Sequence, residues 1–504
     1  SYCHQHHLHS FVCYSQQMTS GEFPRPPGFE DDNQINEAEL AEFMNFMSSS
    51  GKNSGKNSES IVSALGDDRG LARQRGPPGL GLTGESTATV EVTRWKEDGV
   101  DGKDDAHLID EDASFEELLG QDLLKGVYEM GFVKPSRIQA AALPIICTGN
   151  NMIGQAQNGS GKTATFSLAL LSRLEIANEW PQAVVIGPTR ELARQIESVI
   201  QQLGQYLPVK TLLTVPSQDR IPRNAKCHVV IGTPGKLFDL AKKRIVDLSG
   251  VQIFVLDEAD MMLDQENMMG PQVTEIRKLL PKEVQVLFFS ATYPDDVRDF
   301  AQNLVPRATS IKVRKEELTV SSVSQMYMRC NDEWDKFQKL TNLYTAMNVG
   351  QSVIFVNQRK RAFQLSKWMR DGGFAVSLIC GTQTSGDERM DPALRDQVMD
   401  EFRNGVTRVL IATDVLARGI DVPQVTLVVN YDIPINYGNR QADMETYLHR
   451  VGRTGRFGLK GIAVNLVTDR ERAMIDEVCA FFDCRIPEMD EDFEALEERL
   501  KMLR

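Results

Sequence analysis

The chain has 504 residues, which is long for one ordinary domain and predicts two or three. Hydrophobic residues make up 41% of the chain and charged residues 25%, as in globular proteins, and no apolar run reaches the roughly 18 residues that a membrane-spanning helix needs. With a formal net charge of −14, the protein as a whole repels polyanions, so any contact with nucleic acid must be local and gated.

The N-terminus lacks the basic and then apolar pattern of a secretory signal, so a soluble protein that stays inside the cell is expected. The eight cysteines are scattered without paired CxxC spacing, which disfavours both a disulfide framework and a structural zinc site. We therefore expect reduced thiols.

Residues 1–111 are rich in Gly, Ser, Asn, Asp and Pro and show no lasting apolar period. Such a composition buries too little apolar surface to offset the conformational entropy lost on folding. The sequence therefore predicts a disordered N-terminal extension ahead of the folded part of the chain.

From Phe115 onward, short apolar runs rich in β-branched residues alternate with amphipathic stretches. The runs lie at residues 183–186, 229–231, 253–256 and 286–289, and then at residues 352–356, 375–379, 408–411, 427–430 and 462–466. Strands separated by helices in this way predict βαβ units and a parallel sheet. A polar stretch at residues 313–322 divides the two series. We therefore expect two tandem α/β domains, at residues 112–314 and 320–504, joined by a short linker.

A glycine-rich stretch lies between a predicted strand at residues 151–153 and a predicted helix. Glycines allow backbone N–H groups to wrap a phosphate chain, and the helix N-terminus adds the positive end of its dipole. In this arrangement Lys162 reaches the β- and γ-phosphates and Thr163 binds Mg²⁺. We predict an ATP site whose loop consists of Ala156, Gln157, Asn158, Gly159, Ser160, Gly161, Lys162 and Thr163.

A carboxylate cluster, Asp-Glu-Ala-Asp at residues 257–260, follows the predicted strand at residues 253–256. Ligands of open α/β sheets bind at the carboxyl ends of the strands, so this cluster is expected beside the glycine-rich loop. Asp257 is then placed to hold Mg²⁺, and Glu258 to orient and deprotonate the attacking water. The two motifs together predict a nucleoside triphosphatase.

The order of the motifs from about Phe115 to the C-terminus resembles that of the DEAD-box family of RNA helicases. Ala156 stands where the strict P-loop pattern has glycine, and the form AxxGxGKT is typical of RNA helicases of superfamily 2. The resemblance implies two RecA-like domains that close together on ATP and single-stranded RNA, with Mg²⁺ as the metal. It further implies an RNA-dependent ATPase that acts as a monomer.

Other stretches of the first domain resemble motifs of the same family. Residues 131–139 look like the Q motif, which implies that Gln139 reads the edge of the adenine and that Phe115 stacks on its ring. The loops similar to the family's RNA backbone-binding loops contain Pro188, Thr189, Arg190, Thr233, Pro234 and Gly235. The motif that links the ATP state to domain closure is matched by Ser290, Ala291 and Thr292, together with Asp260.

In the second domain, residues 412–421 match the family motif that contacts both substrates. The resemblance implies that Thr413 contacts RNA. It places Gly419 and Asp421 at the ribose of ATP.

A basic motif at residues 449–456 completes the set. A γ-phosphate in transfer develops negative charge that one lysine and one metal ion do not fully neutralise, so arginines from a partner surface can stabilise it. Arg453 and Arg456 are the natural candidates for this role, and His449 belongs to the same motif. Hydrolysis is therefore expected to need both domains.

Two stretches depart from the family pattern. Residues 214–220 read TVPSQDR where the family usually has a double glycine, which leaves one RNA backbone contact unassigned. In the second domain, the family's Q-x-x-R element appears as residues 392–395, with proline in place of glutamine. Arg395 is still expected to contact RNA, whereas the glutamine has no obvious heir in the sequence.

An insertion at residues 435–447 distinguishes the chain from most family members. Together with the absent double glycine and residues 262–265, it resembles the mRNA-export group of the family, which acts at the cytoplasmic face of the nuclear pore. The resemblance implies remodelling of mRNA-protein complexes in the nucleus and cytoplasm. It also implies a nucleoporin as anchor and an activator that uses inositol hexakisphosphate.

Three alternatives stay open. Residues 333–337 are similar to the translation-initiation group of the family. An ATP-locked RNA clamp with little turnover is a second alternative, although Glu258, Arg453 and Arg456 favour turnover. A DNA helicase is the third, which competition between RNA and DNA would decide.

Overall fold

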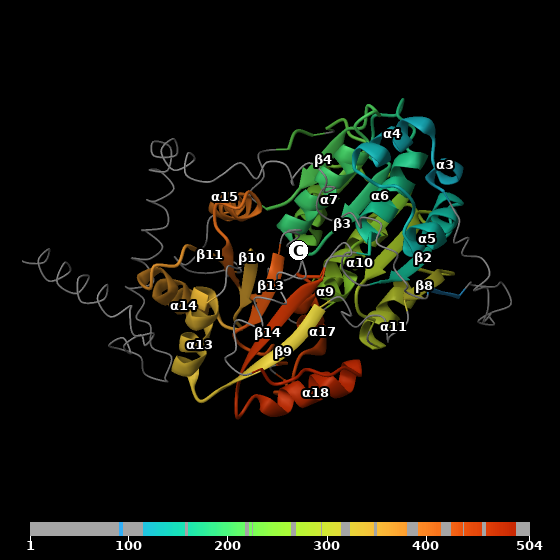
Figure 1. The fold of residues 1–504 in the computed structure, drawn as a ribbon. Helices are drawn as coiled ribbons and strands as arrows, with labels where there is room; N and C mark the ends of the chain where they lie inside the picture. Colours follow the sequence, from blue (N-terminus) through green and yellow to red (C-terminus); the bar gives the residue numbers. More distant parts are fainter. Residues whose placement is uncertain are drawn as a thin grey trace, which may run out of the picture.

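The computed structural model describes residues 90–93, 114–156, 160–216, 221–223, 225–263, 269–293, 295–313, 323–346, 350–380, 392–414, 425–436, 438–455 and 460–489. Within these residues the chain forms two α/β domains, each built on its own sheet (Figure 1). No helix among them is long and apolar enough to cross a membrane. The predicted fold class is confirmed.

The first domain contains an eight-stranded sheet in the order β1-β8-β2-β7-β6-β3-β5-β4. All neighbouring strands are parallel except β1, which pairs antiparallel to β8. The strands are β1 (Val90–Thr93), β2 (Met152–Gln155), β3 (Ala183–Ile186), β4 (Thr211–Thr214), β5 (Val229–Gly232), β6 (Ile253–Leu256), β7 (Gln285–Ser290) and β8 (Thr309–Val313).

Helices cover both faces of this sheet, which is why its central strands are apolar throughout. Val185 belongs to the core on one face and Val184 to the core on the other, as expected from the alternation of side chains along a strand. The helices are α3 (Phe115–Leu118), α4 (Gln121–Glu129), α5 (Arg137–Cys147), α6 (Lys162–Arg173), α7 (Arg190–Leu203), α8 (Pro234–Lys242), α9 (Ala259–Leu263), α10 (Gly270–Leu279) and α11 (Asp295–Leu304).

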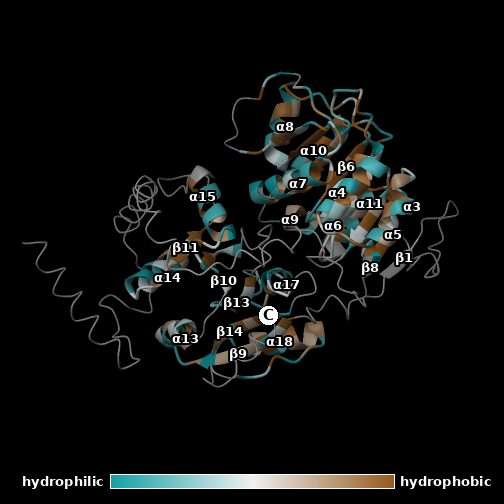
Figure 2. Cartoon of the chain, turned by 45° about the horizontal axis from the view of Figure 1, so that its top comes forward, coloured by the Kyte–Doolittle hydropathy of each residue, from teal (hydrophilic) through white to brown (hydrophobic). Residues whose placement is uncertain are grey.

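The second domain contains a six-stranded, fully parallel sheet in the order β11-β12-β10-β13-β14-β9. Its strands are β9 (Val323–Cys330), β10 (Gln351–Phe355), β11 (Val376–Ile379), β12 (Val409–Ala412), β13 (Val425–Asn430) and β14 (Gly461–Thr468). Its helices are α13 (Glu333–Ala346), α14 (Arg359–Asp371), α15 (Pro392–Arg403), α17 (Met444–Val451) and α18 (Arg472–Phe482). Figure 2 shows β6 of the first domain as hydrophobic, whereas α7 and α15 carry long hydrophilic stretches.

One predicted boundary was wrong. Val90–Thr93 was assigned to the disordered extension, yet it forms β1 at the edge of the first sheet, with Val92 buried. The polar stretch at residues 313–322 begins at Val313, the last residue of β8, which lies inside the predicted domain bound of residue 314. The rest of the predicted extension up to residue 111, together with residues 112–113 and 314–322, lies outside the described residues.

The insertion at residues 435–447 is a shorter loop than predicted. Asp443 caps α17, because its side chain accepts hydrogen bonds from the Thr446 backbone N–H at 3.0 Å and from Thr446 Oγ1 at 2.7 Å. Ile435 forms a β-bridge with Ala442, and Tyr447 is buried in the core. The exposed excursion is therefore confined to residues 436–441, of which Tyr437 is outside the described residues.

Candidate functional site

The glycine-rich loop connects β2 to the N-terminus of α6. Gly161 has a φ of +96°, a left-handed conformation that side chains rarely adopt, and it directly precedes Lys162 and Thr163 in the first turn of α6. The Lys162 ammonium donates a hydrogen bond to the carbonyl of Ala156. Ala156 and Lys162, at the two ends of the loop, are therefore in contact. Gln157, Asn158 and Gly159 lie outside the described residues.

Asp257 stands at the carboxyl end of β6 beside this loop. Its Oδ2 lies 3.4 Å from Thr163 Oγ1, so one hydroxyl and one carboxylate share a buried corner. Burial raises the pKa of Asp257 to about 7, with the nearby Lys162 opposing the rise and Glu258 adding to it. Mg²⁺ is a hard cation that prefers oxygen ligands such as these. The pair fits the predicted metal site.

Glu258 is held in a strained backbone conformation, with a φ of +49°. Its side chain is buried, and within the described residues its Oε2 has no hydrogen-bond partner. A buried carboxylate oxygen without a partner is costly unless a ligand completes it. Strain and an unsatisfied oxygen at one residue point to function rather than to packing.

Gln139 lies against the glycine-rich loop. Its Oε1 accepts a hydrogen bond from the Ser136 backbone N–H at 2.8 Å, in the capping box at the start of α5, while its buried Nε2 has no partner among the described residues. Ser136 Oγ in turn donates to the carbonyl of Ser160 at 3.2 Å. The structure therefore brings the Q motif to the ATP loop and leaves one amide donor for a ligand.

Phe115 occupies a different environment from the one expected of an adenine platform. Its ring is fully buried in the core of the first domain, edge-on to Phe132 with 6.2 Å between centroids. Stacking on adenine requires a free ring face, so this role stays a prediction that needs the ring to be uncovered.

The coupling motif joins the two domains directly. Asp260 Oδ2 accepts hydrogen bonds from the backbone N–H and the hydroxyl of Thr292, at 3.1 and 2.8 Å. The same oxygen lies 3.3 Å from His449 Nε2 in α17 of the second domain. The Ser290 hydroxyl donates to the carbonyl of Thr292 at 2.6 Å, and Ala291 between them is buried. Asp260 therefore connects the predicted coupling motif to the second domain.

Arg453 also reaches the first domain. Its Nη2 lies 4.0 Å from Glu258 Oε1, and its Nε donates to the carbonyl of His449 at 3.0 Å. A cationic side chain from one domain thus stands beside the candidate base of the other. Arg456, Gly419 and Asp421 lie outside the described residues, so their roles stay predictions.

The candidate RNA loops of the first domain lie at helix N-termini. Thr189 caps α7 by accepting from the Leu192 backbone N–H at 3.2 Å, and Pro188 directly precedes it. Thr233 precedes α8, whose first turn contains Pro234 and Gly235. Unpaired N–H groups and the helix dipole make such positions suitable for phosphate. In the second domain, the buried Thr413 Oγ1 has no partner among the described residues.

Two arginines predicted to contact RNA, Arg190 and Arg395, pair with carboxylates of the opposite domain, and their RNA contacts stay predictions. Arg190 Nη2 lies 2.6 Å and Arg194 Nη1 3.1 Å from Asp396 Oδ2 in α15. In the reverse direction, Arg395 Nη2 lies 2.9 Å from Glu191 Oε1. Figure 1 shows α15 facing the green end of the first domain that contains α7. The sequence analysis missed Asp396 and Glu191, and their only signal was adjacency to the two arginines.

Comparison with known proteins agrees with this geometry. The family model described as DEAD/DEAH box helicase matches residues 136–300, and that of the helicase conserved C-terminal domain matches residues 335–458. The chain is 43% identical to the ATP-dependent RNA helicase DBP5 of Mycosarcoma maydis, over 77% of this chain and 84% of that protein. It is 44% identical to the ATP-dependent RNA helicase dbp5 of Schizosaccharomyces pombe, over 77% and 76%.

Solved structures of a yeast relative are similar as well. Saccharomyces cerevisiae Dbp5 bound to RNA and ADP BeF3 has a TM-score of 0.73 and 41% identity, covering 77% of this chain and 99% of that one. A variant of the same protein bound to Nup159, a Gle1 variant, IP6 and ADP has a TM-score of 0.56 and 39% identity, covering 76% and 99%.

Proposed function

This chain belongs to the DEAD/DEAH box family of ATP-dependent RNA helicases, and on that basis we propose that it uses ATP hydrolysis to remodel RNA and mRNA-protein complexes during mRNA export. The observation that carries the proposal is the meeting of His449 and Arg453 with Asp260 and Glu258 across the two domains. A site completed only by domain closure couples hydrolysis to the ligand that closes the domains. In this proposal, that ligand is single-stranded RNA.

The first domain binds the nucleotide. Lys162 is placed to neutralise the β- and γ-phosphates, and Gln139 offers its unpaired Nε2 to the base. Thr163 and Asp257 would hold Mg²⁺, which supplies positive charge to the phosphate oxygens when it is bound. Phe115 is expected to join the base only after its ring is uncovered.

Glu258 acts as the general base in this proposal. Its buried Oε2 has no partner among the described residues, so it is free to accept a hydrogen bond and then a proton from the attacking water. Arg453 supplies positive charge as the γ-phosphate leaves, and Arg456 is proposed to assist it. The arginine arrives from the second domain, so an open chain binds ATP but does not hydrolyse it.

RNA is held by its backbone. The helix N-termini that follow Thr189 and Thr233 are suitable for binding phosphates. Contacts to phosphate and sugar carry no information about the base. The protein has a net charge of −14, so it has little general attraction for RNA while the two domains are apart and each offers only half of the RNA-binding surface. Binding is therefore expected to require ATP, to ignore sequence, and to favour RNA over DNA through the 2′-hydroxyl.

The partners follow the likeness to the yeast relative, whose structures contain Gle1, IP6 and Nup159. We infer that this chain likewise uses a nucleoporin as anchor and an activator that depends on inositol hexakisphosphate. We therefore propose that it acts at the nuclear pore, in the nucleus and the cytoplasm. Purification of the protein from cells with identification of its partners checks this, and partners confined to the ribosomal initiation machinery would contradict it.

Steady-state ATP turnover, measured with and without single-stranded RNA, tests the activity. We expect RNA to raise turnover strongly and single-stranded DNA to compete poorly. A chain that binds RNA with ATP but shows no RNA-stimulated turnover would instead be an ATP-locked clamp.

A further inference from the structure

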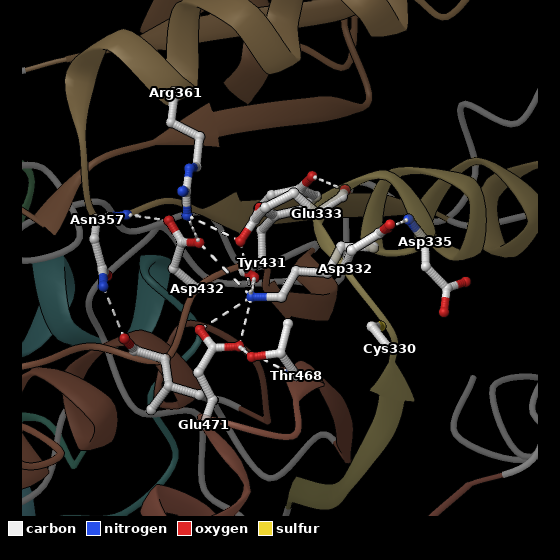
Figure 3. A network of polar contacts seen from close by, with 12 residues as sticks. Cys330, Asp332, Glu333, Asp335, Asn357, Arg361, Tyr431, Asp432, Thr468 and Glu471 are labelled. Carbon is white, nitrogen blue, oxygen red and sulfur yellow. Dashed lines mark hydrogen bonds and ion pairs between the residues drawn. The ribbon is translucent and has the colours of Figure 1, made fainter. Parts of the chain in front are cut away.

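A buried network of charged side chains occupies the carboxyl-end edge of the second sheet, outside the site described above. Figure 3 shows Arg361, Asp432, Tyr431 and Glu471 converging on one point, with Asn357 attached to one side. These residues follow or adjoin β10, β13 and β14, which are neighbouring or nearby strands of the sheet. None of them belongs to a predicted ATP or RNA contact.

Lys336 of α13 lies at the centre of the network and is fully buried. Its ammonium donates to the carbonyl of Tyr431 at 3.0 Å and lies 2.7 Å from Glu471 Oε2. Burial alone would lower the pKa of Lys336, but the carboxylates of Glu471, Asp432 and Glu333 outweigh it and raise that pKa. The lysine is therefore charged and fully committed to its partners.

Asp432 links this lysine to Arg361 and Asn357. Its Oδ1 accepts from Arg361 Nη1 at 2.6 Å, and its Oδ2 accepts from the Asn357 backbone N–H at 2.9 Å. Burial opposes ionisation of Asp432, yet Lys336 and Arg361 lower its pKa below the ordinary value. The ionised carboxylate thereby fixes both its own backbone and that of Asn357.

Asp432 and Asn357 both contact Arg450, a fully buried residue of α17. Arg450 Nη1 donates to the carbonyl of Asp432 and Nη2 to Asn357 Oδ1, each at 2.7 Å. Its Nε donates to Asp414 Oδ1 at 2.5 Å. These three contacts of the guanidinium all lie on other parts of the second domain, so Arg450 ties the last turn of α17 to the sheet edge.

The last turn of α17 contains His449, and Arg453 follows the end of the helix by two residues; both meet the first domain. The Arg453 backbone N–H donates to the carbonyl of Arg450 at 3.1 Å, and Arg453 Nε to that of His449 at 3.0 Å. A shift of this turn would therefore move Arg453 relative to Glu258. Misplacement of about 1 Å can cost on the order of a hundredfold in rate.

Stability alone gives a weak reason for such a network. Replacing a buried ion pair with apolar residues of similar volume is often neutral or stabilising, because desolvation offsets the Coulomb attraction. We therefore attribute the joint burial of Lys336, Asp432 and Arg450 to the fixed geometry that it produces.

We propose that Lys336, Asp432 and Asn357 are positioning residues for ATP hydrolysis, which hold Arg450 and thereby set the place of Arg453. The proposal rests on the proposed role of Arg453 in turnover. It predicts that the network affects the rate of hydrolysis and leaves ATP binding to the first domain unchanged.

The test measures RNA-stimulated kcat, KM for ATP and thermal stability of the full chain in two variants. Lys336→Met removes the central charge at similar length. Asn357→Ala removes the amide that accepts from Arg450 and that also donates to the Ile433 carbonyl at 2.8 Å. We expect each to lower kcat by about tenfold or more with KM for ATP within about twofold. Asp469→Asn is the matched control, because it breaks an exposed ion pair with Arg329 in the same domain at 2.7 Å. Wild-type kcat in both test variants would overturn the proposal.

A double-mutant comparison separates positioning from general weakening of the fold. In an Arg453→Ala background, Asn357→Ala should lower kcat no further, because the residue that it positions is already absent. Independent, multiplicative losses would overturn the proposal and assign the network to stability. If Arg453→Ala itself kept wild-type turnover, the proposed function would fail at that point, whatever the network variants do.

Discussion

At Glu258 the backbone adopts a left-handed φ of +49° that costs a non-glycine residue on the order of 1–3 kcal/mol. The conformation directs a buried carboxylate, one of whose oxygens has no partner among the described residues, toward the site where ATP is expected. Asp257, one residue earlier, faces Thr163 instead. We therefore expect the two adjacent carboxylates to have separate tasks, Asp257 at the metal and Glu258 at the attacking water.

Glu258→Gln is expected to retain ATP binding and lose about 10²- to 10⁴-fold in RNA-stimulated turnover. The amide is the same size as the carboxylate and can still hold water, but it cannot take the water's proton. Nucleotide binding and steady-state turnover, measured on the same preparation, check both halves. Turnover at the wild-type rate would remove Glu258 as the base.

Gly161→Ala is expected to weaken ATP binding strongly. A Cβ at this position would lie 3.0 Å from Gln139 Nε2, in a backbone conformation that costs other residues roughly 1–2 kcal/mol. Gly405→Ala is the matched control, since Gly405 also has a positive φ but its Cβ would meet nothing within 4 Å. Both variants should lose similar stability, and only the first should lose affinity for ATP. If the two variants bound ATP with equal affinity, the contact between the new Cβ and Gln139 would have no effect on ATP binding.

At the scale of elements, α7 and α15 form an interface made of charges. Asp396 accepts two arginines from α7, and Arg395 pairs with Glu191 of the same helix. Proline stands at residue 392, where the family has the glutamine of its Q-x-x-R element. Asp396, four residues further along α15, connects the two domains through its pairs with Arg190 and Arg194.

Asp396→Asn is expected to raise the RNA concentration needed for half-maximal stimulation of turnover by up to about fivefold. The pairs are partly exposed, so their loss should cost about 1 kcal/mol or less. Asp400→Asn on the same helix, where Asp400 is 68% exposed and pairs only at 3.6 Å with Arg403, should change nothing. Tighter RNA binding by Asp396→Asn without ATP would instead mean that the carboxylate competes with phosphate for Arg190.

Across the whole molecule, the central strands were predictable because strands buried on both faces are continuously apolar. Residues 183–186 and 253–256 match β3 and β6 residue for residue. The sequence did not predict β8 or the edge strand β4. Both contain polar residues, Thr-Ser-Ile-Lys-Val in β8 and a threonine at each end of β4, that interrupt the apolar run. Strand β1 escaped because it is four residues long and surrounded by polar chain.

The ATP motifs were predictable for a different reason: each is contiguous, and its chemistry dictates its residue types. Contacts between motifs were harder to predict. That Asp260 accepts from Thr292 and also meets His449 depends on how the domains dock, which no local pattern encodes. The Lys336 network depends likewise on contacts between residues far apart in the sequence, such as that of the Lys336 ammonium with the Tyr431 carbonyl, 95 residues away.

The dependence of hydrolysis on closure of the two domains is tested most directly by the ATP turnover of Arg453→Ala at saturating single-stranded RNA. Arg453 lies 4.0 Å from Glu258 only because the domains meet, whereas ATP itself is proposed to be held by the first domain. Turnover should fall by roughly 10²- to 10³-fold while the affinity for ATP changes by no more than about twofold. Turnover equal to that of the wild type would contradict a site shared between the two domains.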